Sequence, residues 1–174
     1  EEGKLYWIQD AYTYSNQYPY SSNLQQGFNY IRNSVKAVVD AYNGDVNLYV
    51  YDSEDPLIQT YQNIFPDLFK EKKEMPDDLS RHVRYPEDLF KVQVQAYRLY
   101  HMRDPTVFYN REDEWNIPDE IYGQGSRQPM EPYYLITKLP GKQSTEFILI
   151  QPYTPQGRDN MISWLAAKCD ENYG

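Results

Sequence analysis

Apolar and polar positions alternate with two different periods along the chain, and the change of period predicts its elements. Residues 5–14 (LYWIQDAYTY) are rich in aromatic and β-branched side chains, which indicates a β-strand. A second, shorter strand is predicted over residues 29–33. Between the two strands, residues 15–26 are predicted to form a polar loop, which Pro19 and Gly27 punctuate.

The dipeptide Asn43-Gly44 lies between two apolar runs, which favours a β-hairpin with a two-residue type I′ turn. This turn pairs Val39 with Leu48. It makes one face of the hairpin wholly apolar and the other mixed, as a half-buried antiparallel pair requires. A helix over residues 35–42 is the alternative, and the turn signal decides against it. We therefore expect a positive φ angle at Gly44.

The middle of the chain has a helical pattern. A helix is predicted to begin at Asp55-Pro56 and to end near Ile64. Three similar phrases follow, each a proline with an acidic residue after it, and each is predicted to start a helix. They cover residues 66–69, 76–79 and 86–90. Proline suits the first helical position, because the N–H that it lacks has no partner there.

The third of these phrases opens the longest predicted helix, which runs from Pro86 to about His101. At 100° per residue one side of this helix is apolar, and the side chains expected to be buried on it are Leu89, Phe90, Val94 and Tyr97. Gln93 lies in the middle of that side and is expected to have a buried hydrogen-bond partner. Asp104-Pro105 ends the helix and caps a further short helical turn.

The C-terminal part returns to strands. After Trp115 an irregular connector is predicted, followed by a hairpin in which residues 133–139 and 145–151 flank Pro140-Gly141. Residues 147–150 are apolar on both faces, so their strand is expected to be central. Residues 161–168 fit a strand or a helix, and we favour a strand. The predicted class is α+β, with an antiparallel sheet built from the N- and C-terminal hairpins and a helical segment in the middle.

Composition limits the classes of partner. The 174 residues are expected to form a single soluble domain, residues 1–174. A net charge of −9 argues against nucleic acid and anionic lipid as partners. Cys169 is the only cysteine, so no internal disulfide forms. No apolar run approaches the roughly 20 residues of a membrane-spanning helix. Because the chain opens on Glu1 and ends on Gly174 without a closing element, we expect it to be excised from a larger protein.

Few residues point to chemistry. His101, Asp104 and Glu112 are the candidate metal ligands, but their spacing matches no HExxH pattern. A histidine that faces the negative end of the helix dipole is the favoured interpretation of His101. The chain contains no GxSxG, GxxxxGK or GxGxxG motif, so we assign no catalytic residue and no cofactor. Arginines lie among the acids and are expected to pair with them.

Tyrosines are the remaining candidates for a binding site. There are 19 of them. Tyr14, Tyr18 and Tyr20 are interleaved with Ser, Asn and Gln, a composition typical of surfaces that stack on sugars or bind peptides. The alternative is that they line the edge of a sheet. These three are our candidate ligand-binding residues.

Several longer phrases resemble one family. They are LYWIQDAYTYS (5–15), YPYSS (18–22), NYIRNSVKAVVD (29–40), YPEDLF (85–90), the stretch 100–115, and residues 160–167. Together they resemble the large soluble region of an uncharacterised protein family (UPF) of bacterial multi-pass membrane proteins. The resemblance implies an N-terminal bundle of transmembrane helices outside this chain and a soluble region that faces away from the cytoplasm. It implies no activity and no catalytic residue.

These observations favour a non-catalytic extracytoplasmic domain of an integral membrane protein, acting as an interaction or envelope-sensing module. Its expected place is the cell membrane, and its expected partner is a protein or a glycan of the envelope. The alternative is a cell-envelope hydrolase or transferase with a site near His101, Asp104 and Glu112. A cleft that joins these three side chains favours the enzyme, and a convex surface with paired acids favours the module.

Overall fold

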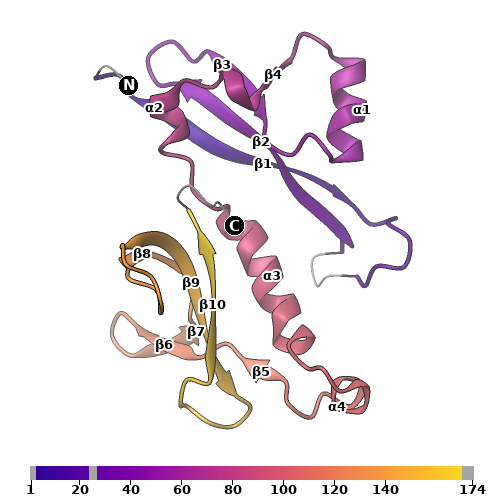
Figure 1. Ribbon diagram of the computed structural model, residues 1–174, viewed down its shortest axis with the longest axis vertical. Coiled ribbons are helices and arrows are strands. Elements are labelled where there is room, and N and C mark those ends of the chain that lie inside the picture. Colours follow the sequence, from indigo (N-terminus) through magenta and orange to yellow (C-terminus); the bar gives the residue numbers. More distant parts are fainter. Residues whose placement is uncertain (1–2, 24–26, 170–174) are drawn as a thin grey trace. The chain divides into compact units, whose positions relative to one another are not determined.

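The structure is a computed structural model that describes residues 3–23 and 27–169 (Figure 1). Internal contacts divide the chain into two compact units, Glu1–Leu89 and Phe90–Gly174. The α+β class is confirmed, with antiparallel hairpins at both ends and helices in the middle. The N- and C-terminal hairpins form separate sheets, however, where one shared sheet was expected. Each sheet takes its further strand from the middle of the chain.

The first unit contains a four-stranded sheet in the order β1 (Tyr6–Ser15), β2 (Tyr30–Asp40), β3 (Val46–Val50) and β4 (Phe69–Glu71). The first three strands are antiparallel, and β4 is parallel to β3. The helix start expected at residues 66–69 is wrong. These residues form a turn that leads into β4, because Phe69 pairs with Leu48 and packs beside a buried cluster of the sheet.

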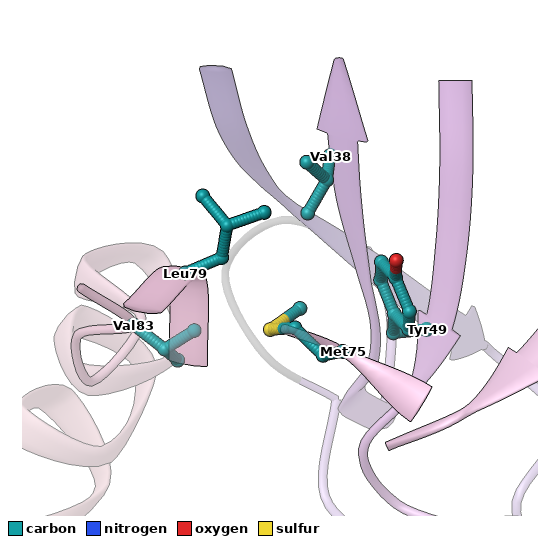
Figure 2. Packing of buried hydrophobic residues seen from close by; sticks show 5 residues of the cluster. All are labelled: Val38, Tyr49, Met75, Leu79 and Val83. Atoms are coloured by element: carbon teal, nitrogen blue, oxygen red, sulfur yellow. The ribbon is translucent and has the colours of Figure 1, made fainter. Parts of the chain in front are cut away.

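Helices cover both faces of this sheet. On one face, Ile58 of α1 (Pro56–Ile64) packs against Val35 and Val50. On the other face, Val38 and Tyr49 meet Met75, Leu79 and Val83, the residues around α2 (Asp77–Ser80), as Figure 2 shows. The two clusters lie on opposite faces because successive side chains of β2 point in opposite directions. The 3-10 turn η1 (Lys72–Glu74) precedes α2.

The hairpin between β2 and β3 is present, but its predicted register is wrong by two residues. Val39 pairs with Val46 instead of Leu48. The loop is longer than a type I′ turn because the Asp40 carboxylate accepts from the Tyr42 and Asn43 N–H groups, and the Asn43 side chain accepts from the Asp45 N–H. The expected positive φ at Gly44 is confirmed, at +78°.

A shift of two residues keeps every side chain on its face, yet the burial differs from the prediction. The mixed face is the more deeply buried one, and Lys36 on it is only 1% exposed. Its ammonium group pairs with the carboxylate of Asp10, which lies directly opposite on β1. Pairing is what allows a cation to be buried at all.

The second unit is built around β9 (Glu146–Pro155), which pairs with β8 (Tyr133–Thr137), β10 (Ser163–Lys168) and β5 (Trp115–Asn116). Ile148, Leu149 and Tyr153 are fully buried, so the central strand is confirmed. The hairpin over Pro140-Gly141 and the strand within residues 161–168 are confirmed as well. The expected irregular connector contains a two-stranded hairpin, β6 (Asp119–Tyr122) and β7 (Ser126–Pro129), that the sequence did not indicate.

The long helix is confirmed as α3 (Glu87–Tyr100), and the short one after it as α4 (Pro105–Asn110). Phe90 and Val94 are buried, and the Tyr153 hydroxyl donates to the Val94 carbonyl at 3.0 Å. The rest of the predicted apolar side is wrong. Leu89 is half-buried, Tyr97 is 41% exposed, and Gln93 is exposed although a buried partner was expected for it. The buried stripe is therefore narrower than the helical wheel suggests.

Candidate functional site

The candidate site is a loop that we call the tyrosine loop, residues 16–23 after β1, together with residues 27–29 before β2. Asn29 holds it in place. The Asn29 side-chain oxygen accepts from the Tyr18 N–H at 3.0 Å, and its amide nitrogen donates to the Tyr18 carbonyl at 2.7 Å. The Ser21 hydroxyl donates to the Asn29 carbonyl at 2.8 Å. The side-chain amide of Asn29 therefore binds both the N–H and the carbonyl group of Tyr18 and holds the backbone of the loop at this residue.

Tyr20 lies at the tip of this arrangement with its side chain fully exposed. Its φ angle is +61°, in the left-handed region that a residue with a Cβ adopts only at a cost. Strained conformations of this kind persist where the surroundings enforce them, and they gather at functional sites. The Asn29 contacts supply the enforcement here.

The other two candidate tyrosines flank it. Tyr18 stacks on Tyr30 with ring centroids 5.1 Å apart, and Tyr14 lies tilted against Phe28 at 6.3 Å. Both side chains remain exposed over half or more of their surface. A rigid, exposed aromatic ring with a hydroxyl can stack on a sugar or an apolar side chain and donate a hydrogen bond at a low entropic cost.

Sequence reasoning missed two residues, one in this loop and one near the start of β1. Asn29 was placed in a strand, and nothing in its neighbourhood marks it as the clamp. Trp7 on β1 was expected only as part of a strand, yet it is 71% exposed. A signal for Trp7 exists in the alternation of the strand, because residues 7 and 9 share one face and Gln9 is polar.

The structure does not bring the candidate metal ligands together. Asp104 caps α4 by accepting from the Thr106 and Val107 N–H groups at 2.8 and 3.1 Å. Glu112 accepts from the Asn110 amide at 3.0 Å. Within residues 3–23 and 27–169, no group of three His, Cys, Asp or Glu side chains is placed to hold a metal ion. Asp104 and Glu112 thus have local structural partners.

His101 has different partners from those expected. Its imidazole ring stacks on the Trp115 indole with centroids 3.6 Å apart, and Nδ1 lies 3.1 Å from the Tyr97 carbonyl. A carbonyl only accepts, so Nδ1 carries the proton. Nε2 is buried without a hydrogen-bond partner, 3.6 Å from the nearest oxygen of Asp113. Beside it, Arg98 donates to the Trp115 carbonyl at 2.7 Å and to Glu114 at 2.9 Å. The expected pairing of arginines with acids holds at this position.

A second polar centre lies in the first unit, around the completely buried Asp55. The Asp55 carboxylate accepts from the hydroxyls of Thr13, Ser34 and Tyr30 at 2.5, 2.6 and 2.6 Å. Burial by itself would raise the pKa of Asp55, but the hydrogen bonds from these side chains and from the Leu57 N–H outweigh it and lower the pKa. Burial, helped by the neighbouring carboxylate, raises the pKa of Tyr30 to about 12.

The described residues include no helix that combines the length and the apolar character needed to cross a membrane. The protein-family model described as an uncharacterised protein family (UPF0182) matches residues 1–174. No solved structure shows a significant match.

Several curated relatives are similar along nearly the whole chain. A UPF0182 protein of Pelotomaculum thermopropionicum is 58% identical over 174 residues, which are 99% of this chain and 19% of that protein. One from Microcystis aeruginosa is 60% identical over 172 residues, 98% of this chain and 18% of that protein. One from Methanospirillum hungatei is 53% identical over 180 residues, 99% of this chain and 20% of that protein. The chain thus spans about a fifth of the length of these relatives, and it belongs to the uncharacterised protein family UPF0182.

Proposed function

We propose that this chain is a non-catalytic interaction module that binds its partner through the tyrosine loop. The observation that carries the proposal is Tyr20, an aromatic side chain that is fully exposed on a strained backbone held by the Asn29 contacts. A fully exposed side chain gains no packing energy that could offset the cost of a strained backbone. Contact between this ring and a binding partner can offset that cost.

The proposal of a non-catalytic module also agrees with the surroundings of the acidic side chains that an enzyme would use. Asp104 and Glu112 are engaged in local hydrogen bonds, and Asp55 is saturated by hydroxyl and N–H donors. A hydrolase or transferase at His101 has one observation in its favour, the unpartnered Nε2. Asp113 lies 3.6 Å from this nitrogen, but the sequence contains no nucleophile motif, and a general base without a nucleophile lacks a main part of the machinery for covalent hydrolysis.

We place the module on the extracytoplasmic side of a cell membrane, as one part of a longer polypeptide. The location follows what the sequence resemblance implies, and relatives about five times the length of this chain support the longer polypeptide. A Tyr109→Cys variant in the longer protein tests this placement, because Tyr109 is exposed and the native Cys169 is buried. A membrane-impermeant maleimide labels that variant in intact cells if the placement holds, and labels it only after lysis if the module is cytoplasmic.

The binding role is tested with a photo-crosslinking amino acid at position 20 and, as the matched control, at position 109. Both positions hold exposed tyrosines, but only position 20 lies in the tyrosine loop. We expect an adduct with an envelope protein, or retention on an array of envelope glycans, that depends on position 20 and is lost in Asn29→Ala. Equal behaviour at both positions contradicts the proposal. Hydrolytic turnover that is lost in His101→Ala favours the enzyme instead.

A further inference from the structure

Strand β1 is an open edge of the first sheet. It pairs with β2 on one side, and within residues 3–23 and 27–169 no strand pairs with its other side (Figure 1). A free edge carries backbone N–H and C=O groups that are ready to pair with another chain. The hydrogen-bond pattern between β1 and β2 determines which backbone groups of β1 point toward this open side.

The phase of that pattern is set by two contacts. The Ala41 N–H donates to the Leu5 carbonyl at 3.1 Å, so this directly opposed pair is hydrogen-bonded. Such pairs alternate with non-bonded pairs in an antiparallel ladder. Residues 7 and 9 therefore bond to β2, while Tyr6, Ile8 and Asp10 turn their backbone groups outward. The Asp40 N–H, which donates to the Asp45 carbonyl at 2.9 Å, agrees with this phase, because it shows that the even residues of β2 bond to β3.

This edge has little of the protection that natural edges carry. Proteins usually blunt an edge with lysine, proline, a short strand or a bulge. The ten residues of β1 contain no lysine and no proline, and the irregularity in its pairing comes only between Ala11 and Thr13. Its single charge is Asp10, which is engaged with Lys36. The segment from Tyr6 to Asp10 is thus regular and lacks these protective features, although the Gln9 side-chain amide donates to the Asp10 carbonyl at 3.4 Å.

Side chains on both sides of the segment suit an apolar strand. Trp7 is exposed on one face, in the same cross-strand row as Val39 and the exposed Val46. On the opposite face, Tyr6 and Ile8 lie partly buried against the cluster of Val38 and its neighbours. A strand laid along the edge would extend both apolar faces at once.

We propose that the Tyr6–Asp10 edge of β1 accepts an extended polypeptide strand from a partner, as an additional strand of the first sheet. The strand is apolar and neutral or basic. Acidic residues outnumber basic ones 26 to 17 in this chain, and Asp10, the one charged side chain on β1, is acidic. The same charge argues against a second copy of this chain, which would bring −9 against −9. This surface is separate from the tyrosine loop and stands without it.

The first test measures backbone amide exchange by NMR in the chain without a partner. We expect the Tyr6, Ile8 and Asp10 amides to exchange at least tenfold faster than those of Trp7 and Gln9, because only the latter two donate to β2. Equal protection of all five amides would show that the edge is already covered within the chain, and would overturn the proposal.

The second test selects binders from a displayed library of random decapeptides. Selected peptides should be apolar and uncharged or basic, and they should slow the exchange of the three outward amides. We expect Trp7→Lys to weaken their binding by at least tenfold, because it places a cation at the edge without removing a buried side chain. Ile8→Pro should act alike, because it removes an outward N–H. Tyr109→Ser is the control and should leave binding unchanged, as should Tyr20→Ala.

Each other outcome contradicts the inference. Unchanged affinity in Trp7→Lys, a selection that yields no binder, or selected peptides that are mainly acidic would each overturn it. So would a concentration-dependent dimer lost in Trp7→Lys, because the edge would then serve a second copy. Loss of peptide binding in Tyr20→Ala would assign the site to the tyrosine loop instead.

Discussion

Asp55 in the first unit and Asp104 in the second begin their helices with the same signature, an aspartate before a proline. Both carboxylates accept N–H groups of the first helical turn. Asp104 remains exposed, and its carboxylate caps α4 through the Thr106 and Val107 N–H groups. Asp55 is completely buried and also accepts three hydroxyl groups, from residues 21 to 42 positions away in the sequence. The same local motif is a surface cap in one unit and a buried anchor in the other.

This difference in burial and hydrogen bonding explains why Asp55 is a structural residue and not a candidate for catalysis. A carboxylate offers about four lone-pair sites. The three hydroxyls and the Leu57 N–H supply that number of donors to Asp55, with the Ile58 N–H at the longer distance of 3.4 Å. No site is left for a substrate, so Asp55 serves β1, β2 and α1 by holding them together.

Removal of the buried anchor should have the largest effect. In Asp55→Ala the buried hydroxyls of Thr13 and Ser34 and the partly buried hydroxyl of Tyr30 lose their acceptor, and each unsatisfied buried group costs about 1–3 kcal/mol. We expect the free energy of unfolding, measured by urea titration, to fall by about 4 kcal/mol. A loss below about 1 kcal/mol would mean that the two carboxylates are equivalent after all.

Lowering the pH tests how much the ionised Asp55 carboxylate contributes to stability. The folded pKa of Asp55 lies below its ordinary value, so the unfolded chain takes up the proton first as the pH falls. The stability that the ionised group contributes is complete above about pH 4, the ordinary pKa of aspartate, and is lost as the pH falls through the folded pKa. Unfolding followed between pH 7 and pH 2 should show a shallower loss in Asp55→Asn than in the wild type. A steeper loss in the variant would reverse the sign and contradict the anchor.

Removal of a single hydroxyl group that donates to Asp55 should have an intermediate effect on stability. Ser34→Ala removes a buried hydrogen bond to a charged acceptor, which is worth about 2 kcal/mol. The same substitution made in an Asp55→Asn background should cost less, because the acceptor is no longer charged. A double-mutant cycle by chemical unfolding measures the coupling, and we expect about 0.5 kcal/mol or more. Additive effects would separate Ser34 from the anchor.

The surface cap should give the smallest effect. Asp104→Ala removes an exposed N-cap and should lower the free energy of unfolding by about 1 kcal/mol. Thermal unfolding beside Asp55→Ala provides the measurement. A loss as large as that of Asp55→Ala would refute the distinction between the two motifs.

Local signals predicted local structure well. The helix starts at Asp55, Pro76, Pro86 and Asp104, the positive φ at Gly44 and the central strand β9 all follow from short stretches of sequence. The failures have two causes: the wrong register of the β2–β3 hairpin comes from local contacts of Asp40 and Asn43, and the wrong helix start comes from a partner that is distant in sequence. The phrase at residues 66–69 was read as a helix start, yet pairing with β3 draws it into β4.

The candidate site shows the same division. Composition marked Tyr14, Tyr18 and Tyr20, and all three are exposed beside one loop. Whether they bind a ligand stays a prediction. The Asn29 clamp and the stack of His101 on Trp115 could not be foreseen, because both depend on which side chains the backbone brings within a few ångströms.

The sequence by itself determined the class of the fold, the caps of its helices and the family of the chain, because these depend on neighbouring residues or on the identity of many positions. Only the tertiary structure decided which of two identical Asp-Pro caps is buried, which face of the β2–β3 hairpin is the more deeply buried, and which edge of the first sheet stays open. These outcomes depend on packing between distant segments, where burial multiplies the free energy of each polar contact.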